Sequence, residues 1–245
     1  MNLLEVQGLR KTYPAFRLED VSFSVPEGAV MGLIGRNGAG KSTTLKSILG
    51  LVHPDAGCVE MFGREFSENE RYIKENIGVV LGGIDFYPKK KVRTITDVTR
   101  RFYSNWQEEK YRHYLDLFAI DENKRVDQLS SGMRVKYLLA LALSHNARLL
   151  ILDEPTSGLD PVSRDELTEL LRRIASDGTR SVLFSTHITS DLEKCASHIT
   201  FIQEGRLQRS DTLAGFMAHY ADLGSTLEEI IVAAERRSYD ADAII

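Results

Sequence analysis

The sequence predicts an α/β protein with a mixed sheet, an antiparallel β subdomain at the N-terminus and an inserted helical subdomain. Short apolar runs rich in β-forming residues alternate with helical patterns, which is typical of buried parallel strands joined by crossover helices. The first 30 residues instead alternate apolar and polar positions. Residues 83–146 show helical periodicity without a convincing strand.

Apolar side chains recur along the N-terminal stretch in the manner of a strand. Because successive side chains of a strand point to opposite faces, this pattern predicts antiparallel strands, which we expect at the edge of the sheet. The sequence Pro-Glu-Gly at residues 26–28 is a turn signal before the next apolar run. The apolar positions are Leu18, Val21, Phe23 and Val25.

Five short apolar runs predict the strands of the central sheet, and helical patterns separate most of them. The first run is followed by a helical stretch over residues 41–49. A helical lobe over about 83–146 interrupts the alternation of strands and helices. The five runs are residues 29–34, 77–81, 149–152, 181–185 and 199–202.

Capping signals predict where the later helices begin. Ser163 and Thr226 are each followed three residues later by glutamate, as in a capping box, and Pro161 fits a first helical turn. Residues 224–245 predict a last helix followed by a loose tail.

Composition excludes several classes of protein. The 245 residues carry 31 basic and 35 acidic side chains, a formal net charge of -4, which argues against binding nucleic acid through a basic surface. Cys58 and Cys195 form no metal-binding or redox motif, so we expect reduced thiols in the cytoplasm. No secretory signal is visible, and the apolar runs are far below the roughly 20 residues that span a bilayer. If this protein serves a membrane, another chain crosses it.

Residues 35–42 read GRNGAGKS, which matches the phosphate loop G-x-x-x-x-G-K-[ST] between a strand and a helix. The glycines let backbone N–H groups surround phosphates, Lys41 adds a positive charge, and the Ser42 hydroxyl can bind Mg²⁺. A chance glycine-rich turn is the simpler alternative. The dinucleotide fingerprint fits worse, because Thr43 stands where its third glycine belongs. The motif predicts a P-loop NTPase core.

Two carboxylates, Asp153 and Glu154, follow the apolar run 149–152. Ligands of open α/β sheets bind at the carboxyl ends of the strands. Successive side chains diverge, so Asp153 can hold Mg²⁺ through water while Glu154 faces the γ-phosphate and the attacking water. A solvated acidic pair is the alternative, and the phosphate loop makes it less favoured.

A serine and a glycine within LSSGM, residues 129–133, open a strongly helical stretch 23 residues before Asp153. With this motif the sequence resembles the ATP-binding cassette (ABC) family of transport ATPases, whose signature is LSGGQ. The resemblance covers about residues 1–215, leaving 216–245 as a C-terminal helix and tail. Five elements follow the family's order: Tyr13, the phosphate loop, the signature, the acidic strand end, and SGLD at 157–160 with His187.

The resemblance implies a role for individual residues. Tyr13 would stack on adenine, and Asp160 would bridge the two halves of a dimer, although Asp160 could equally be a helix N-cap. Glu154, His187 and Lys41 would be catalytic. Ser42 and Asp153 would bind Mg²⁺. The residues implied to contact ATP are Tyr13, Gly35, Asn37, Gly38, Ala39, Gly40, Lys41, Ser42, Thr43, Ser130, Ser131, Gly132 and Asp160.

The family also implies partners. The signature of one protomer caps ATP held by the phosphate loop of the other, so we expect a homodimer or a heterodimer with a similar subunit. The dimer would drive a transmembrane permease from the cytoplasmic face of the membrane. Residues 102–106 and a missing glutamine resemble subunits of bacterial exporters of peptides, antibiotics or other amphiphiles.

One departure from the family lies after the run 77–81, where Gly82 and Gly83 replace a glutamine that contacts Mg²⁺. Asp85 or a water could fill its place. The basic loop 87–93 is either a solvated surface or a docking site for the permease or lipid headgroups. Two further functions stay open: a regulatory module that dimerises with ATP but hydrolyses it weakly, and a soluble family member without a permease.

Overall fold

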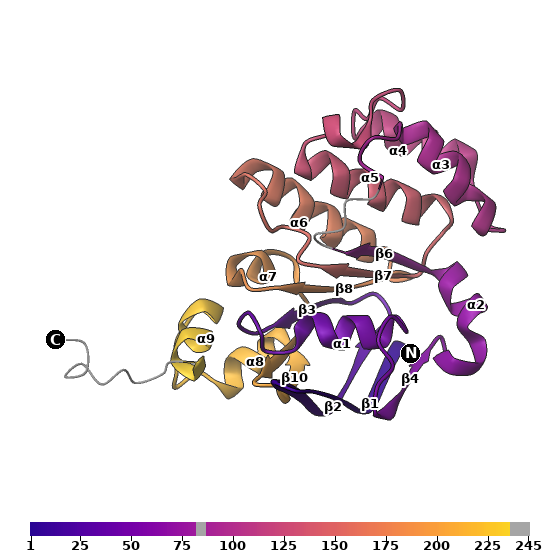
Figure 1. Cartoon of the computed structure of the whole chain (residues 1–245). Helices are drawn as coiled ribbons and strands as arrows, with labels where there is room; N and C mark the ends of the chain where they lie inside the picture. Colours follow the sequence, from indigo (N-terminus) through magenta and orange to yellow (C-terminus); the bar gives the residue numbers. More distant parts are fainter. Residues whose placement is uncertain (82–86, 236–245) are drawn as a thin grey trace.

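A ten-stranded mixed sheet runs through the computed structural model, which describes residues 1–81 and 87–235 (Figure 1). Its strand order is β5-β4-β1-β2-β10-β9-β3-β8-β7-β6. The sheet is antiparallel at the β5 end and parallel at the β6 end, as the sequence predicts for the fold class.

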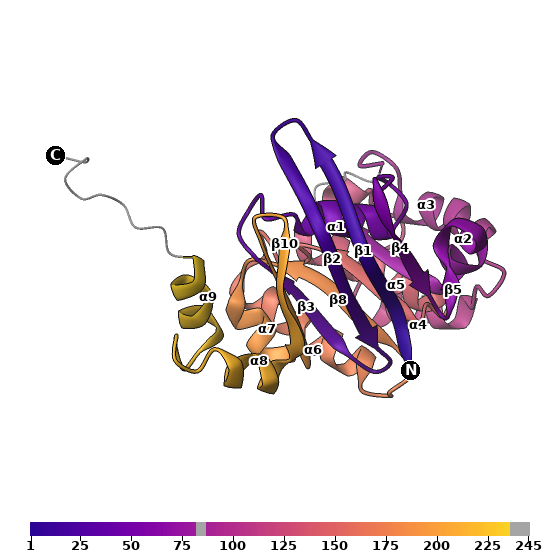
Figure 2. The same ribbon diagram turned by 90° about the horizontal axis from the view of Figure 1, so that it is seen from below.

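The antiparallel portion is built from strands close together in sequence. β1 pairs antiparallel with both β2 and β4, and Figure 2 shows β4 on one side of the β1–β2 pair and β10 on the other. The prediction of edge strands for the first 30 residues is therefore wrong, because β4 and β10 cover the outer sides of β1 and β2. The strands are β1 (Asn2–Tyr13), β2 (Phe16–Pro26), β4 (Ala56–Met61) and β5 (Arg64–Glu65).

The parallel portion confirms the five apolar runs as strands. β3 pairs parallel with β8 and β9, β8 with β7, and β7 with β6. β10 returns antiparallel to β9 and touches β2 at one pair, Arg206 with Glu19. The strands are β3 (Val30–Ile34), β6 (Ile77–Leu81), β7 (Leu149–Asp153), β8 (Ser181–Thr186), β9 (His198–Gln203) and β10 (Arg206–Thr212).

Helices cover both faces of the parallel strands. α1 lies between these strands and the β1–β2 hairpin, where Leu45 and Ile48 share a core with both (Figure 1). α6 and α7 pack on the opposite face around Leu171, Leu192 and Phe184. The helices are α1 (Lys41–Ile48), α2 (Phe66–Asn76, bent at Asn69), α6 (Pro161–Ala175) and α7 (Thr189–Cys195).

The C-terminal helices α8 (Leu213–His219) and α9 (Leu227–Glu235) belong to the same core as α6 and α7. Phe216, Leu227 and Ile230 are completely buried there. The predicted division at residue 215 falls inside α8 and stays a prediction. The predicted last helix is present, and the tail expected after it lies outside the described residues.

The two predicted capping boxes have different outcomes. Thr226 and Glu229 exchange hydrogen bonds of 3.2 Å between side chain and backbone N–H in both directions, which confirms the first turn of α9. Ser163 does not open a helix, because α6 begins at Pro161 with Asp160 as its N-cap. Asp160 accepts hydrogen bonds from two backbone N–H groups and from the Ser163 hydroxyl. It therefore binds N–H groups of the first turn that have no partner within the helix.

In its described residues, 87–146, the inserted segment consists of helices joined by turns, with one isolated β-bridge between Lys91 and Arg125. Hydrogen bonds between buried hydroxyl groups link its helices: Thr96 Oγ1 lies 2.7 Å from the Tyr111 hydroxyl and 2.9 Å from that of Tyr137. The elements are α3 (Val92–Thr99), α4 (Glu108–Leu117), α5 (Ser131–Ser144) and the 3₁₀ turns Arg100–Phe102 and Val126–Gln128.

Tyr137→Phe is expected to destabilise the protein by about 1–3 kcal/mol, because it removes the two buried hydrogen bonds that the Tyr137 hydroxyl makes with Thr96 and Val92. The Tyr137 hydroxyl also donates to the Val92 carbonyl at 3.1 Å, and the side chain is buried between α5 and α3. Denaturant unfolding measures the loss. Tyr72→Phe, at a partly exposed ring on α2, is the matched control. Equal unfolding midpoints for the two variants would contradict the prediction.

Candidate active site

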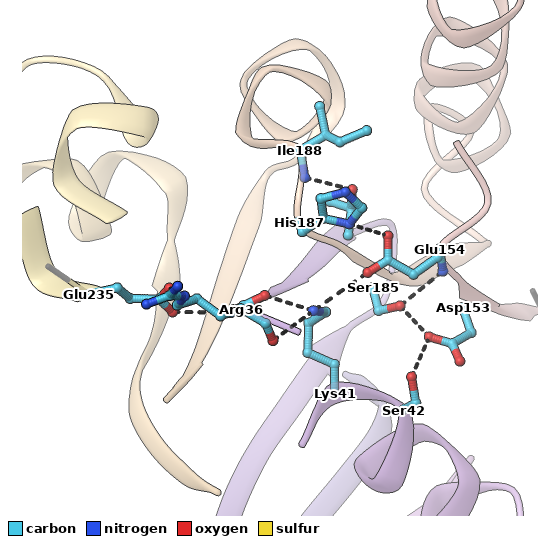
Figure 3. Close-up of polar contacts among 11 residues, drawn as sticks. Arg36, Lys41, Ser42, Asp153, Glu154, Ser185, His187, Ile188 and Glu235 are labelled. Atoms are coloured by element: carbon cyan, nitrogen blue, oxygen red, sulfur yellow. Dashed lines mark hydrogen bonds and ion pairs between the residues drawn. The ribbon is translucent and has the colours of Figure 1, made fainter. Parts of the chain in front are cut away.

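The carboxyl ends of three neighbouring parallel strands bring the predicted site residues together (Figure 3). β3 runs into the phosphate loop, β7 ends at Asp153, and β8 is followed by His187. Their pairing aligns Ile34 with Thr186 and Asp153 with Ser185. Segments more than a hundred residues apart in sequence therefore meet at one edge of the sheet.

The phosphate loop, residues 35–42, is shaped by glycines that no other residue could replace without strain. Gly40 has a φ of 113°, and a Cβ there would lie 2.9 Å from Cζ of Phe16. Gly40 is also the N-cap of α1, where no side chain of the described residues caps the helix. The first N–H groups of α1 are thus left for an anion.

Lys41 is folded back onto its own loop. Its ammonium donates to the carbonyl oxygens of Gly35 at 2.7 Å and Arg36 at 3.2 Å, and it lies 3.5 Å from Glu154 Oε1. The side chain is only 5 % exposed. The loop therefore holds a buried positive charge at the place where phosphates are expected.

Asp153 and Ser42, the predicted Mg²⁺ ligands, lie in contact. Asp153 Oδ1 accepts a hydrogen bond from Ser42 Oγ at 3.2 Å and another from Ser185 Oγ at 2.5 Å. A carboxylate beside a hydroxyl offers the hard oxygen donors that Mg²⁺ prefers. The residues present at this position fit a magnesium ion, and Ser185 orients the carboxylate.

Glu154 is held between Lys41 and His187. Its Oε2 lies 2.8 Å from His187 Nδ1, while its backbone N–H donates to the Ser185 hydroxyl at 3.0 Å and carbonyl at 3.1 Å. Its φ of 50° is in the left-handed region, which turns the chain sharply after β7. This turn directs the carboxylate toward the phosphate loop (Figure 3).

A cavity of about 570 Å³ opens over this cluster. Eight predicted residues line it, and four further ones were not predicted: Ala15, Phe16, Arg36 and Ser157. Tyr13 is not among the described residues that line it; its ring is 39 % exposed on the β1–β2 hairpin. Phe16, three residues later, lines the cavity, and the stacking of Tyr13 on adenine stays a prediction. The predicted residues that line it are Asn37, Gly38, Gly40, Lys41, Ser42, Thr43, Glu154 and His187.

The signature residues, Ser130 to Gly132, lie elsewhere and are not among the described residues of this cavity. Ser130 is the N-cap of α5 and accepts from the Met133 N–H at 3.2 Å. A Cβ on Gly132 would lie 3.3 Å from Ser163 Oγ on α6. Signature and phosphate loop are thus separate surfaces of one chain.

Asp160 is a helix N-cap, as its alternative interpretation predicts. Its hydrogen bonds from Ser163 and from two N–H groups lower the pKa of its carboxyl. Nothing in one chain tests its bridging role, which stays a prediction. Gly82, Gly83 and Asp85, where the family glutamine is missing, lie outside the described residues.

Comparison with known proteins agrees with this geometry. The ABC transporter family matches residues 18–157. The bacitracin transport ATP-binding protein BcrA of Bacillus licheniformis is 32 % identical over 208 residues, 84 % of this chain and 68 % of that protein. The Nod factor export ATP-binding protein I of Burkholderia orbicola is 38 % identical over 191 residues, 76 % of this chain and 62 % of that protein.

Solved structures show the same fold. The structure of an ATP-binding subunit of an ABC transporter superposes with a TM-score of 0.85 at 28 % identity, over 96 % of this chain and 100 % of that one. The ATP-binding cassette MJ0796, solved as a post-hydrolysis dimer with ADP and phosphate, has a TM-score of 0.75 at 21 % identity, over 86 % and 98 % of the two chains.

No helix of the described residues is long and apolar enough to cross a membrane. The family match, which spans both the phosphate loop and the acidic strand end, agrees with the relatives and with the fold. This chain belongs to the ABC transporter family.

Proposed function

We propose that this chain binds ATP with Mg²⁺ in the cavity over the phosphate loop and hydrolyses it to power a membrane exporter. The observation that carries the proposal is the position of Glu154 beside the phosphate loop, where its carboxylate contacts both Lys41 and His187. The intact Glu154–His187 contact argues against the alternative of a dimerisation module with weak hydrolysis.

Each residue has a physical role in the proposed reaction. Glu154 orients and polarises the attacking water, and His187 fixes the Glu154 carboxylate through its 2.8 Å contact. Lys41 and the N–H groups of the loop compensate the charge that develops on the γ-phosphate. Magnesium held by Ser42 and Asp153 would supply further neutralisation of phosphate charge.

The proposed hydrolysis requires a second chain. The cavity is open and is lined by the phosphate-loop half of the site, while Ser130 to Gly132 lie on another surface. We therefore propose a homodimer, or a heterodimer with a similar subunit, in which the signature segment of one chain caps ATP bound to the other.

A groove of about 310 Å³ between β6, α5 and the 3₁₀ turn after α3 is the proposed docking site of the permease. Val79, Leu138 and Leu141 make it apolar, and burial lowers the pKa of His145 to about 4, so that this side chain is uncharged at neutral pH. Four basic residues follow β6 in the sequence after residues 82–88: Lys89, Lys90, Lys91 and Arg93. The export function, and a position at the cytoplasmic face of the membrane, rest on the bacitracin and Nod factor relatives.

Glu154→Gln is expected to abolish steady ATP hydrolysis, by about 100-fold or more, because an amide cannot act as the general base. Phosphate release by the purified chain, alone and with its permease, measures the effect. The exposed Glu109→Gln on α4 is the matched control and should hydrolyse ATP like the wild type. Brisk turnover by Glu154→Gln would refute the assignment.

Lys41→Ala is expected to weaken ATP binding by about 10–100-fold, since it removes a charge-assisted contact to the phosphates. Isothermal titration with ATP and Mg²⁺ measures the dissociation constant. Lys46→Ala, at an exposed lysine of the same helix α1, should bind ATP normally. Similar affinities for the two variants would exclude Lys41 from phosphate binding.

Ser131→Arg, introduced into Glu154→Gln, is expected to keep the ATP-bound protein monomeric, because a bulky cation would occupy the proposed contact surface of the signature. Glu154→Gln alone should form a dimer with ATP, as measured by light scattering. Ser104→Arg in the same background is the control, at an exposed serine away from the signature. A dimer of the Ser131→Arg protein would contradict the sandwich arrangement.

A further inference from the structure

Arg36, the second residue of the phosphate loop, lines two cavities at once. One is the 570 Å³ cavity over Lys41, and the other, of about 350 Å³, lies between the loop, Gln203 and the end of α9. The side chain is 58 % exposed, so a modest change of rotamer can move its guanidinium from one cavity toward the other.

Glu235, the last residue of α9, holds Arg36 on the side away from Glu154 (Figure 3). Glu235 Oε1 accepts a hydrogen bond from the Arg36 backbone N–H at 3.1 Å, and Oε2 lies 3.7 Å from Arg36 Nε. The carboxylate thus contacts both the backbone and the cation of one loop residue. The Arg36 carbonyl meanwhile accepts from Lys41, so Glu235 and Lys41 hold the same residue from two sides.

The position of Glu235 is fixed by the rest of α9. Leu227 and Ile230 are buried in the main core, and the Leu227 N–H donates to Glu193 Oε1 at 2.6 Å. At the far end of the helix, Gln203 Nε2 donates to the Ala234 carbonyl at 3.2 Å. Contacts at both ends of α9 therefore hold the Glu235 carboxylate against the phosphate loop.

The negative charge of Glu235 beside the phosphate loop repels the negatively charged phosphates of a nucleotide. The Glu235 side chain is only 6 % exposed, so water screens its field weakly. Burial raises the pKa of its carboxyl, while the Arg36 N–H, the Arg36 guanidinium and Lys41 act to lower it.

We propose that Arg36 is a nucleotide-binding residue and that Glu235 binds its guanidinium when no nucleotide is present. ATP and the C-terminal helix then compete for the same guanidinium. This rests on the proposed binding of ATP in the cavity over the phosphate loop. When the phosphates of ATP enter, the Arg36 guanidinium leaves the Glu235 carboxylate and contacts the phosphates, which carry more negative charge. Helix α9 then loses one of its contacts with the phosphate loop. The nucleotide affinity of the chain is therefore set partly by its C-terminal helix.

The test is isothermal titration of the full chain with a non-hydrolysable ATP analogue and Mg²⁺, using Glu235→Gln, Arg36→Met and the double variant. Gln keeps the size and an acceptor oxygen for the Arg36 N–H while removing the charge. Glu235→Gln is expected to bind the analogue about 3–10-fold more tightly, and Arg36→Met about 3–10-fold more weakly. In the double variant the gain from Glu235→Gln should disappear.

The outcomes separate this inference from the proposed function. Unchanged or weaker binding by Glu235→Gln would show that Glu235 only braces the loop. A gain of equal size in the Arg36→Met background would show a field effect without Arg36, and either result overturns the proposal. Because Arg36 is largely exposed, Arg36→Met tests the proposal even if Glu235→Gln fails to fold: wild-type affinity in Arg36→Met overturns it. A wild-type chain that binds no analogue would instead overturn the proposed function, and this inference with it.

Discussion

Lateral pairing of β3, β8 and β7 is the constraint on which the candidate site depends. These strands are parallel neighbours, so the chain leaves each of them at the same edge of the sheet. Ser185 extends the constraint to the side chains, because its hydroxyl contacts Asp153 and its hydroxyl and carbonyl both accept from the Glu154 N–H. The relative positions of the carboxylates are thus set by strand register as well as by the loops themselves.

Local patterns in the sequence are sufficient to predict much of this architecture. The run 77–81 became β6 and the stretch from Lys41 became α1, since buried strands and amphipathic helices differ in period. The phosphate loop and the acidic strand end were found because their chemistry requires particular residue types at fixed spacing. The contact between Ser42 and Asp153 follows from these two motifs and the parallel topology.

Local patterns do not encode relations between distant segments, and the prediction of edge strands failed for this reason. Alternating residues in 1–30 indicate strands, but whether these lie at an edge depends on β4 and β10, which come later in the chain. The choice between Tyr13 and Phe16 at the cavity depends on how the β1–β2 hairpin folds over the loop. Arg36 and Glu235 are 199 residues apart, and no motif links them. The Asp-Pro pair before α6, in contrast, was an available N-cap signal that competed with Ser163.

The left-handed backbone of Glu154 has an energetic consequence. A residue with a Cβ held at positive φ costs on the order of 1–3 kcal/mol, and here the contacts with Ser185 offset that strain. The backbone strain is therefore located at the residue proposed to activate water. A glycine at this position would relax the backbone but remove the carboxylate, so the strain cannot be relieved there without losing the group proposed to activate water.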